Sequence, residues 1–249
     1  MAERILLNDL TYVTLLSLDY GKSSGSGFLL SYQNSDYLVT ARHVLYDNDE
    51  LRCKSVLISS QNSRSKNEDS KMFDIKVSDS ILLDNRSTDV AIIPLGNIAK
   101  MELKEYVDMV QVGTLQPLSI NQHQLRLLND IGIANEVYLV GFPTSLLFQD
   151  SKAFEPGKPL LRKGIVAGIN WEDGTFIIDC SAYYGNSGGP VIELCEDNQL
   201  RVIGIVSRYI PFVIEWRNNR EMSVIHAEYA NSGYSVCIPI DAVLNLINQ

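Results

Sequence analysis

The chain has 249 residues, of which 45% are hydrophobic and 20% are charged, a composition typical of a globular protein with a substantial core. Its formal net charge is −9 and it has no run of Lys and Arg, so nucleic acid is not an expected partner. The apolar run Ile5–Leu7 is too short for a signal peptide or a membrane span, and we expect no membrane association.

Short apolar runs separated by polar turns predict strands through the first half of the chain. The runs are rich in Val, Ile, Tyr, Phe and Leu, and each is too short for a typical helix. Six such strands suit a closed antiparallel barrel, which leaves no strand edge exposed. The predicted strands are Thr11–Leu18, Gly27–Tyr32, Asp36–Thr40, Ser55–Ser59, Phe73–Val77 and Val90–Leu95.

The middle of the chain has weaker patterns. Ser60–Lys71 contains no apolar residue and is predicted to be a solvated loop. Ala99–Val110 has loosely spaced apolar residues that favour a short helix. It lies within Asn97–Asp130, which we expect to link two barrels.

Six further runs predict a second set of strands, followed by a short helix. Asp241–Asn248 places Val243, Leu244 and Ile247 on one side of that helix. The fold class is therefore all-β, with residues 1–115 in a first barrel and residues 116–249 in a second. The strands of the second set are Val137–Val140, Ile165–Ile169, Phe176–Cys180, Val191–Leu194, Leu200–Ser207 and Tyr234–Ile238.

Gly185–Pro190 places Ser187 between glycines, which is typical of a tight turn or of an exposed nucleophile. The pattern also fits the Gly-x-Ser-x-Gly elbow of the α/β-hydrolases, in which the histidine follows the serine. After Ser187 the chain has only His226, and no helical pattern surrounds it. His43 and Asp89 instead precede Ser187, each among apolar strand-like residues. This is the order of chymotrypsin-type enzymes and argues against the hydrolase elbow.

These segments resemble the trypsin-like serine peptidases. The signature blocks are Val39–His43, Asp89–Ala91 and Gly185–Pro190, and the resemblance runs from about Gly25 to Ile247. Gly233–Pro239 and the segment before Ser187 look most like the bacterial high-temperature-requirement branch, without its appended peptide-binding domain. The resemblance implies two six-stranded antiparallel Greek-key β-barrels packed together, with a short C-terminal helix.

The resemblance also implies a role for each residue of the three blocks. Ser187 would be the nucleophile, because a nearby base can take its proton. His43 would be that base and later the acid, and Asp89 would orient the imidazole. The backbone amides of Gly185 and Ser187 would form the oxyanion hole. No metal or cofactor is expected.

Further residues match the substrate-binding part of that family. Ser181 would form the floor of the primary specificity pocket, and a neutral hydroxyl there disfavours substrates with Lys or Arg before the scissile bond. Ser207, Arg208 and Tyr209 would pair with substrate backbone, and Tyr209 either narrows the pocket entrance or turns outward. Strand alternation predicts that Asp179 is a buried structural carboxylate.

These residues predict a serine endopeptidase that acts on a protein or peptide substrate. A catalytically silent, protease-like binding module and an esterase with the same three groups remain alternatives. The four cysteines, Cys53, Cys180, Cys195 and Cys237, show no metal-type spacing, and we expect reduced thiols and a cytoplasmic location.

The segment 210–232 is long for the connection that it makes and is rich in apolar residues, among them Trp216. It predicts either an extra hairpin packed on the second barrel or a surface for a regulatory protein partner. In the second case the segment would act together with Ser145–Pro159, and Trp216 would be partly exposed.

Overall fold

The structure is a computed structural model of the whole chain. It describes residues 5–19, 21–61, 66, 71–78, 82–97, 102–103, 109–111, 118–147, 152–153, 155, 157–217 and 224–249.

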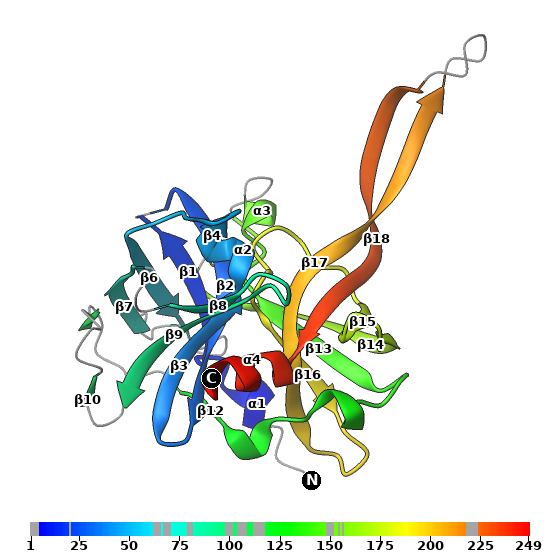
Figure 1. Cartoon of the computed structure of the whole chain (residues 1–249). Coiled ribbons are helices and arrows are strands. Elements are labelled where there is room, and N and C mark those ends of the chain that lie inside the picture. Colours follow the sequence, from blue (N-terminus) through cyan, green and yellow to red (C-terminus); the bar gives the residue numbers. More distant parts are fainter. Residues whose placement is uncertain are drawn as a thin grey trace.

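The first half of the chain forms a curved sheet (Figure 1). Its main strands match the six predicted from the sequence and run in the antiparallel order β9-β3-β2-β1-β6-β7. Short strands extend this sheet. Among the described residues, the strands at its two ends do not pair with each other, so the sheet is open. The main strands are β1 (Val13–Leu18), β2 (Ser23–Tyr32), β3 (Ser35–Ala41), β6 (Ser55–Ser60), β7 (Lys71–Lys76) and β9 (Val90–Asn97). The short strands are β8 (Leu83–Asn85), β10 (Glu102–Leu103), β11 (Met109–Gln111) and β12 (Ile120–Asn121), and β4 (Tyr46–Asp47) pairs apart with β5 (Glu50–Leu51).

The helix predicted over Ala99–Val110 is wrong where the structure describes that segment. Glu102–Leu103 pairs with β9, and Met109–Gln111 pairs with β7. Pairing with the edges of an existing sheet prevails here over a weak helical pattern. The rest of the segment, and most of the predicted loop Ser60–Lys71, lie outside the described residues.

The second half forms a closed antiparallel barrel in the order β13-β14-β15-β18-β17-β16. A short C-terminal helix follows the barrel. The two antiparallel sheets and this helix confirm the prediction of an all-β double barrel. The buried face of this helix carries Ile240, Val243 and Leu246, whereas the sequence pattern indicated Leu244 and Ile247 beside Val243. The elements are β13 (Glu136–Gly141), β14 (Leu160–Asn170), β15 (Thr175–Asp179), β16 (Pro190–Leu194), β17 (Leu200–Arg217), β18 (Val224–Pro239) and α4 (Ile240–Ile247). The other helices are α1 (Ile5–Asn8), α2 (Arg42–Leu45), α3 (Thr144–Leu147) and two 3₁₀ turns, Gln122–Gln124 and Leu128–Asp130.

One hydrophobic core joins the two halves. This core contains the buried residues of the first sheet. It continues into Val140, Ile205 and Ile238 of the second barrel and into α4. A smaller core lies within the second barrel, around residues such as Phe176. The shared core packs the two sheets together, and the division at 115/116 stays a prediction.

The described residues of the segment 210–232 lie in a long hairpin of β17 and β18 that projects away from the second barrel (Figure 1). Phe212 is 59% exposed and Trp216 is 60% exposed, so of the two alternatives the hairpin packed on the second barrel is wrong. The twelve described strand pairs between Gly204 and Arg217 hold the segment in strand form instead. The partial exposure expected for Trp216 is met.

All four cysteines are buried and unpaired. Burial raises the pKa of the Cys53 thiol to about 11 and raises that of Cys237 well above its ordinary value, which suppresses the reactive thiolate. Titration in denaturant without reductant should give four thiols per chain, and the native protein should react far more slowly. A count of two or none would contradict the unpaired arrangement.

No helix in the described ranges has both the length and the apolar composition needed to cross a membrane.

Candidate active site

His43 and Asp89 lie together because β3 and β9 pair at their ends. Ala41 pairs with Val90, so α2 begins beside the turn that carries Asp89. Asp89 has a φ of 53°, a left-handed conformation that Asp adopts more readily than most residues. The carbonyl of Asp89 accepts a hydrogen bond from the Arg42 amide at 3.0 Å, which fixes the turn against α2.

The Asp89 carboxylate holds one side of the His43 imidazole. Its Oδ2 lies 2.9 Å from His43 Nδ1, and its Oδ1 accepts the His43 backbone N–H at 3.0 Å. The hydroxyl of Ser207 donates to the same Oδ2 at 2.5 Å. Because a carboxylate only accepts hydrogen bonds, the Nδ1 of a neutral His43 carries the proton and its Nε2 is left as a proton acceptor.

Two opposing effects act on the pKa of Asp89. Burial raises the pKa, but the hydrogen bonds and charge of His43 and the hydroxyl of Ser207 outweigh burial and hold it below its ordinary value. Asp89 is therefore ionised at neutral pH and is available to stabilise a protonated imidazole.

Ser187 lies on a turn that only glycines can form. Gly185 and Gly188 have φ of 98° and 83°, and a Cβ on Gly188 would collide with the carbonyl of Ser26 and the hydroxyl of Thr40. The Ser187 hydroxyl donates to the carbonyl of Ser207 at 3.1 Å and makes no hydrogen bond to His43. This hydrogen bond must break before the hydroxyl can donate to the imidazole.

Ser26, which the sequence analysis did not single out, holds this turn in place. Its backbone N–H donates to the Ser187 carbonyl at 2.9 Å, and its hydroxyl donates to the Gly185 carbonyl at 2.6 Å. The same hydroxyl accepts the Phe142 N–H at 2.8 Å, and the side chain is fully buried. Ser26 thus ties the first sheet to the turn of the second barrel, a role that only the three-dimensional contacts reveal.

The amides predicted for the oxyanion hole have a defined orientation. The Tyr184 carbonyl accepts hydrogen bonds from the backbone and hydroxyl of Ser145, at 3.3 Å and 3.2 Å. In a trans peptide the N–H points opposite to the carbonyl, so the Gly185 N–H points away from Ser145. Neither this amide nor that of Ser187 donates a hydrogen bond to another described residue.

A cleft of about 520 Å³ contains most of the predicted site residues. His43, Ser187 and Gly185 line it together with Ser207, Arg208 and Tyr209. The Tyr209 ring packs edge-on against Tyr184 with centroids 6.0 Å apart, so it borders the cleft.

Two predicted side chains lie elsewhere. Ser181 does not line the cleft and lies instead beside Gly233. Asp179 is exposed, so its prediction as a buried carboxylate is wrong, because the buried residues of β15 are Phe176 and Ile178. Among the described residues, no group of three or more His, Cys, Asp or Glu side chains is arranged to hold a metal ion.

Comparison with known proteins agrees with this geometry. The sequence profile of the trypsin-like peptidase domain matches residues 25–205. The fold is similar to the serine endoprotease from Yersinia pestis, with a TM-score of 0.54 and 14% identity over 98% of this chain and 64% of that one. It is also similar to the MamO protease domain from Magnetospirillum magneticum, with a TM-score of 0.53 and 12% identity over 96% of both chains. Among curated proteins, none matches the sequence. The chain belongs to the trypsin-like peptidase domain family.

Proposed function

We propose that the protein is a serine endopeptidase that hydrolyses peptide bonds through an acyl-enzyme on Ser187. The observation that carries the proposal is the contact of the Asp89 carboxylate with Nδ1 of His43, at 2.9 Å, because His43 and Ser187 line the same cleft. This contact leaves the other imidazole nitrogen as a base, which is what a serine hydroxyl requires to act as a nucleophile at neutral pH.

In the first half of the reaction, the Ser187 oxygen attacks the carbonyl carbon of the scissile bond while Nε2 of His43 takes its proton. The negative charge formed on the carbonyl oxygen is stabilised by the amides of Gly185 and Ser187. The C–N bond then breaks, and His43 returns the proton to the leaving amine. Asp89 stays ionised and stabilises the imidazolium between these two transfers.

In the second half, water attacks the ester carbon of the acyl-enzyme, and His43 takes a proton from that water. The ester bond breaks, the carboxylic acid product leaves, and His43 returns the proton to the Ser187 oxygen. The same groups hydrolyse esters, so an ester substrate belongs in every assay beside a peptide.

The cleft disfavours Lys and Arg side chains before the scissile bond. Lys22, Arg52 and Arg208 line it, and none of its described residues is acidic. A peptide library should therefore give a preference for small to medium apolar residues over Lys and Arg, because a basic side chain meets only like charges there. A profile dominated by basic residues would contradict this prediction.

Reaction with a fluorophosphonate probe tests the proposed function directly. The probe should label the wild-type protein covalently and leave Ser187→Ala unlabelled, with the adduct found by mass spectrometry on the peptide that contains Ser187. No label, in protein with a cooperative thermal transition, would overturn the proposal.

A second candidate is a protease-like binding module that does not react. The hydrogen bond from Ser187 to the Ser207 carbonyl favours it, because the hydroxyl is then directed away from the base. Peptide binding without labelling would support this candidate. Either function fits a cytoplasmic location, which we propose from the four unpaired thiols.

A further inference from the structure

One edge of β17 opens where the strand leaves the barrel. β16 pairs with β17 from Leu200 to Ile205, and the turn after Ser187 extends this pairing to Val206 through Gly188 and Gly189. Beyond Val206, the described pairing of β17 is with β18 alone and continues to Arg217. Among the described residues, no strand therefore pairs along the hairpin with the edge that faced β16.

This open edge begins at the candidate active site. The Ser207 carbonyl accepts the Ser187 hydroxyl, so β17 faces the nucleophile at that residue. The register against β18 shifts at Val206/Arg208 and again at Tyr209/Pro211, which adds twist without interrupting the strand. Pro211 has no N–H to donate, and Pro in strands is confined to edges and bulges such as this one.

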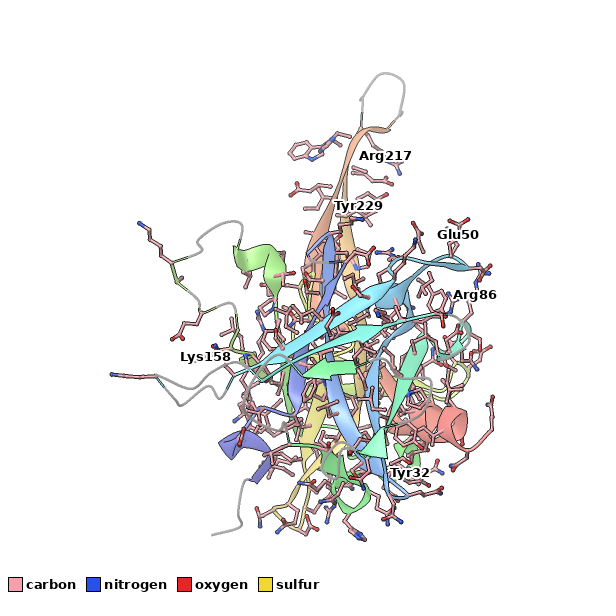
Figure 2. All side chains as sticks on the ribbon, turned by 90° about the vertical axis from the view of Figure 1, so that its left-hand side faces the viewer. Tyr32, Glu50, Arg86, Lys158, Arg217 and Tyr229 are labelled. Atoms are coloured by element: carbon pink, nitrogen blue, oxygen red, sulfur yellow. The ribbon has the colours of Figure 1, made fainter. Side chains whose placement is uncertain are left out.

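The side chains along the open strand are apolar and exposed. Phe212, Ile214 and Trp216 lie on one face of the hairpin, because every second residue of a strand shares a face. They are 59%, 38% and 60% exposed. Val213 and its cross-strand partner Tyr229 lie on the other face, at 42% and 65% exposure. Figure 2 shows Tyr229 and Arg217 on the part of the hairpin that projects from the body of the protein.

From Ile210 to Arg217, the two charged side chains of β17 pair with each other. Arg217 is paired with Glu215 of the same strand, with its Nη2 2.6 Å from the carboxylate. A two-stranded hairpin in water is marginally stable, and a third strand stabilises it by pairing its edge and covering its apolar side chains. The surface therefore suits an extended, uncharged peptide better than an acidic or basic one.

We infer that the open edge of β17 from Ile210 to Arg217 binds an extended, apolar segment of the substrate. The inference rests on the proposed function, which places the scissile bond at Ser187. A peptide that pairs antiparallel with β17 at Ser207–Tyr209 places its earlier residues farther along the hairpin, because the two strands run in opposite directions. At equal rise per residue, the bound segment lies about five to ten residues before the scissile bond.

Two peptides with the same cleavage sequence test this inference. The short one begins four residues before the scissile bond, and the long one carries eight further residues with apolar side chains. Binding at a remote edge stabilises the substrate and the transition state equally, so the long peptide should have a KM about tenfold lower at similar kcat. N-methylation of alternate amides in the extension should remove this advantage, because the paired N–H groups are lost.

Variants then locate the effect on the hairpin. Phe212→Ser combined with Trp216→Ser should abolish the advantage of the long peptide and leave cleavage of the short one unchanged. Trp171→Ser is the matched control, because Trp171 is 62% exposed in the turn before β15. Both sites are exposed, so all variants should keep the wild-type thermal transition within a few degrees.

A binding measurement separates this inference from the proposed function. In a Ser187→Ala, Trp171→Phe background, Trp216 is the only tryptophan of the chain, and its emission should shift to shorter wavelength with the long peptide but not the short one. This result would stand even if no peptide were cleaved. Equal KM values and no shift in emission would overturn the inference while leaving the proposed function intact. A Phe212 and Trp216 variant that loses self-association or vesicle binding, with the peptide preference unchanged, would also overturn it.

Discussion

Replacing Ser187 by alanine should reduce peptidase activity by about 10⁴-fold or more, because the acyl-enzyme then cannot form. The variant should still fold, since the Ser187 hydroxyl makes one hydrogen bond, to a carbonyl at the edge of the cleft, and the turn itself is held by the Ser26 hydroxyl and by backbone groups. The measurement is kcat/KM for a cleaved peptide, beside the thermal transition of each protein.

Ser145→Ala is the matched control for this prediction. It also removes one hydroxyl beside the cleft, but its backbone N–H still binds the Tyr184 carbonyl. Its activity should stay within about tenfold of wild type, as expected for a single neutral hydrogen bond. Ser187→Ala protein with near-wild-type activity would show that another residue is the nucleophile.

The sequence predicted the framework of this protein because the framework depends on local patterns. Apolar runs in the sequence predicted all six strands of the second barrel. They also predicted β3 and β9, whose paired ends carry His43 and Asp89 in the structure. The glycines around Ser187 predicted a tight turn, and the structure shows Gly185 and Gly188 at positive φ in it.

The contacts that depend on packing were not predictable in the same way. In the sequence, Ser26 is one small residue among glycines and shows no pattern of its own. Its hydroxyl is hydrogen-bonded to Phe142 and Gly185, which are 116 and 159 residues away along the chain. The projecting hairpin has the apolar composition of a packed element, so the sequence allowed packing on the barrel as well as the exposure of Trp216 that the structure shows. The rotamer of Ser187 follows from the position of the Ser207 carbonyl, which no pattern in the chain encodes.

Asp89→Asn should lower kcat by about 10⁴-fold at neutral pH while leaving the fold intact. Asn is the right substitution because Asp89 has a φ of 53°, and Asn tolerates this left-handed conformation where alanine would be strained. The Asn carbonyl can still accept the His43 backbone N–H, but the amide group is a donor. When that donor faces Nδ1, the proton moves to Nε2 and His43 can no longer act as the base.

A double variant distinguishes this role from a merely structural one. The double variant Ser187→Ala, Asp89→Asn should lose no more activity than Ser187→Ala alone, because the groups act as a unit. Independent, multiplying losses, or an Asp89→Asn enzyme near the wild-type rate, would remove Asp89 from the mechanism.

The pH dependence of stability gives a further readout of the same contact. The pKa of Asp89 is lower in the folded protein than in the unfolded chain, so ionised Asp89 stabilises the fold above the unfolded-state value of about 3.9. That stabilisation is lost as the pH falls through the lower folded-state pKa. Wild type should therefore be more stable than Asp89→Asn at neutral pH, and the gap should close as the pH falls below about 4. A gap that stays constant down to pH of about 2 would mean that the carboxylate is not the source of the difference, and that the hydrogen bonds of Asp89 to His43 and Ser207 stabilise the site without their charge.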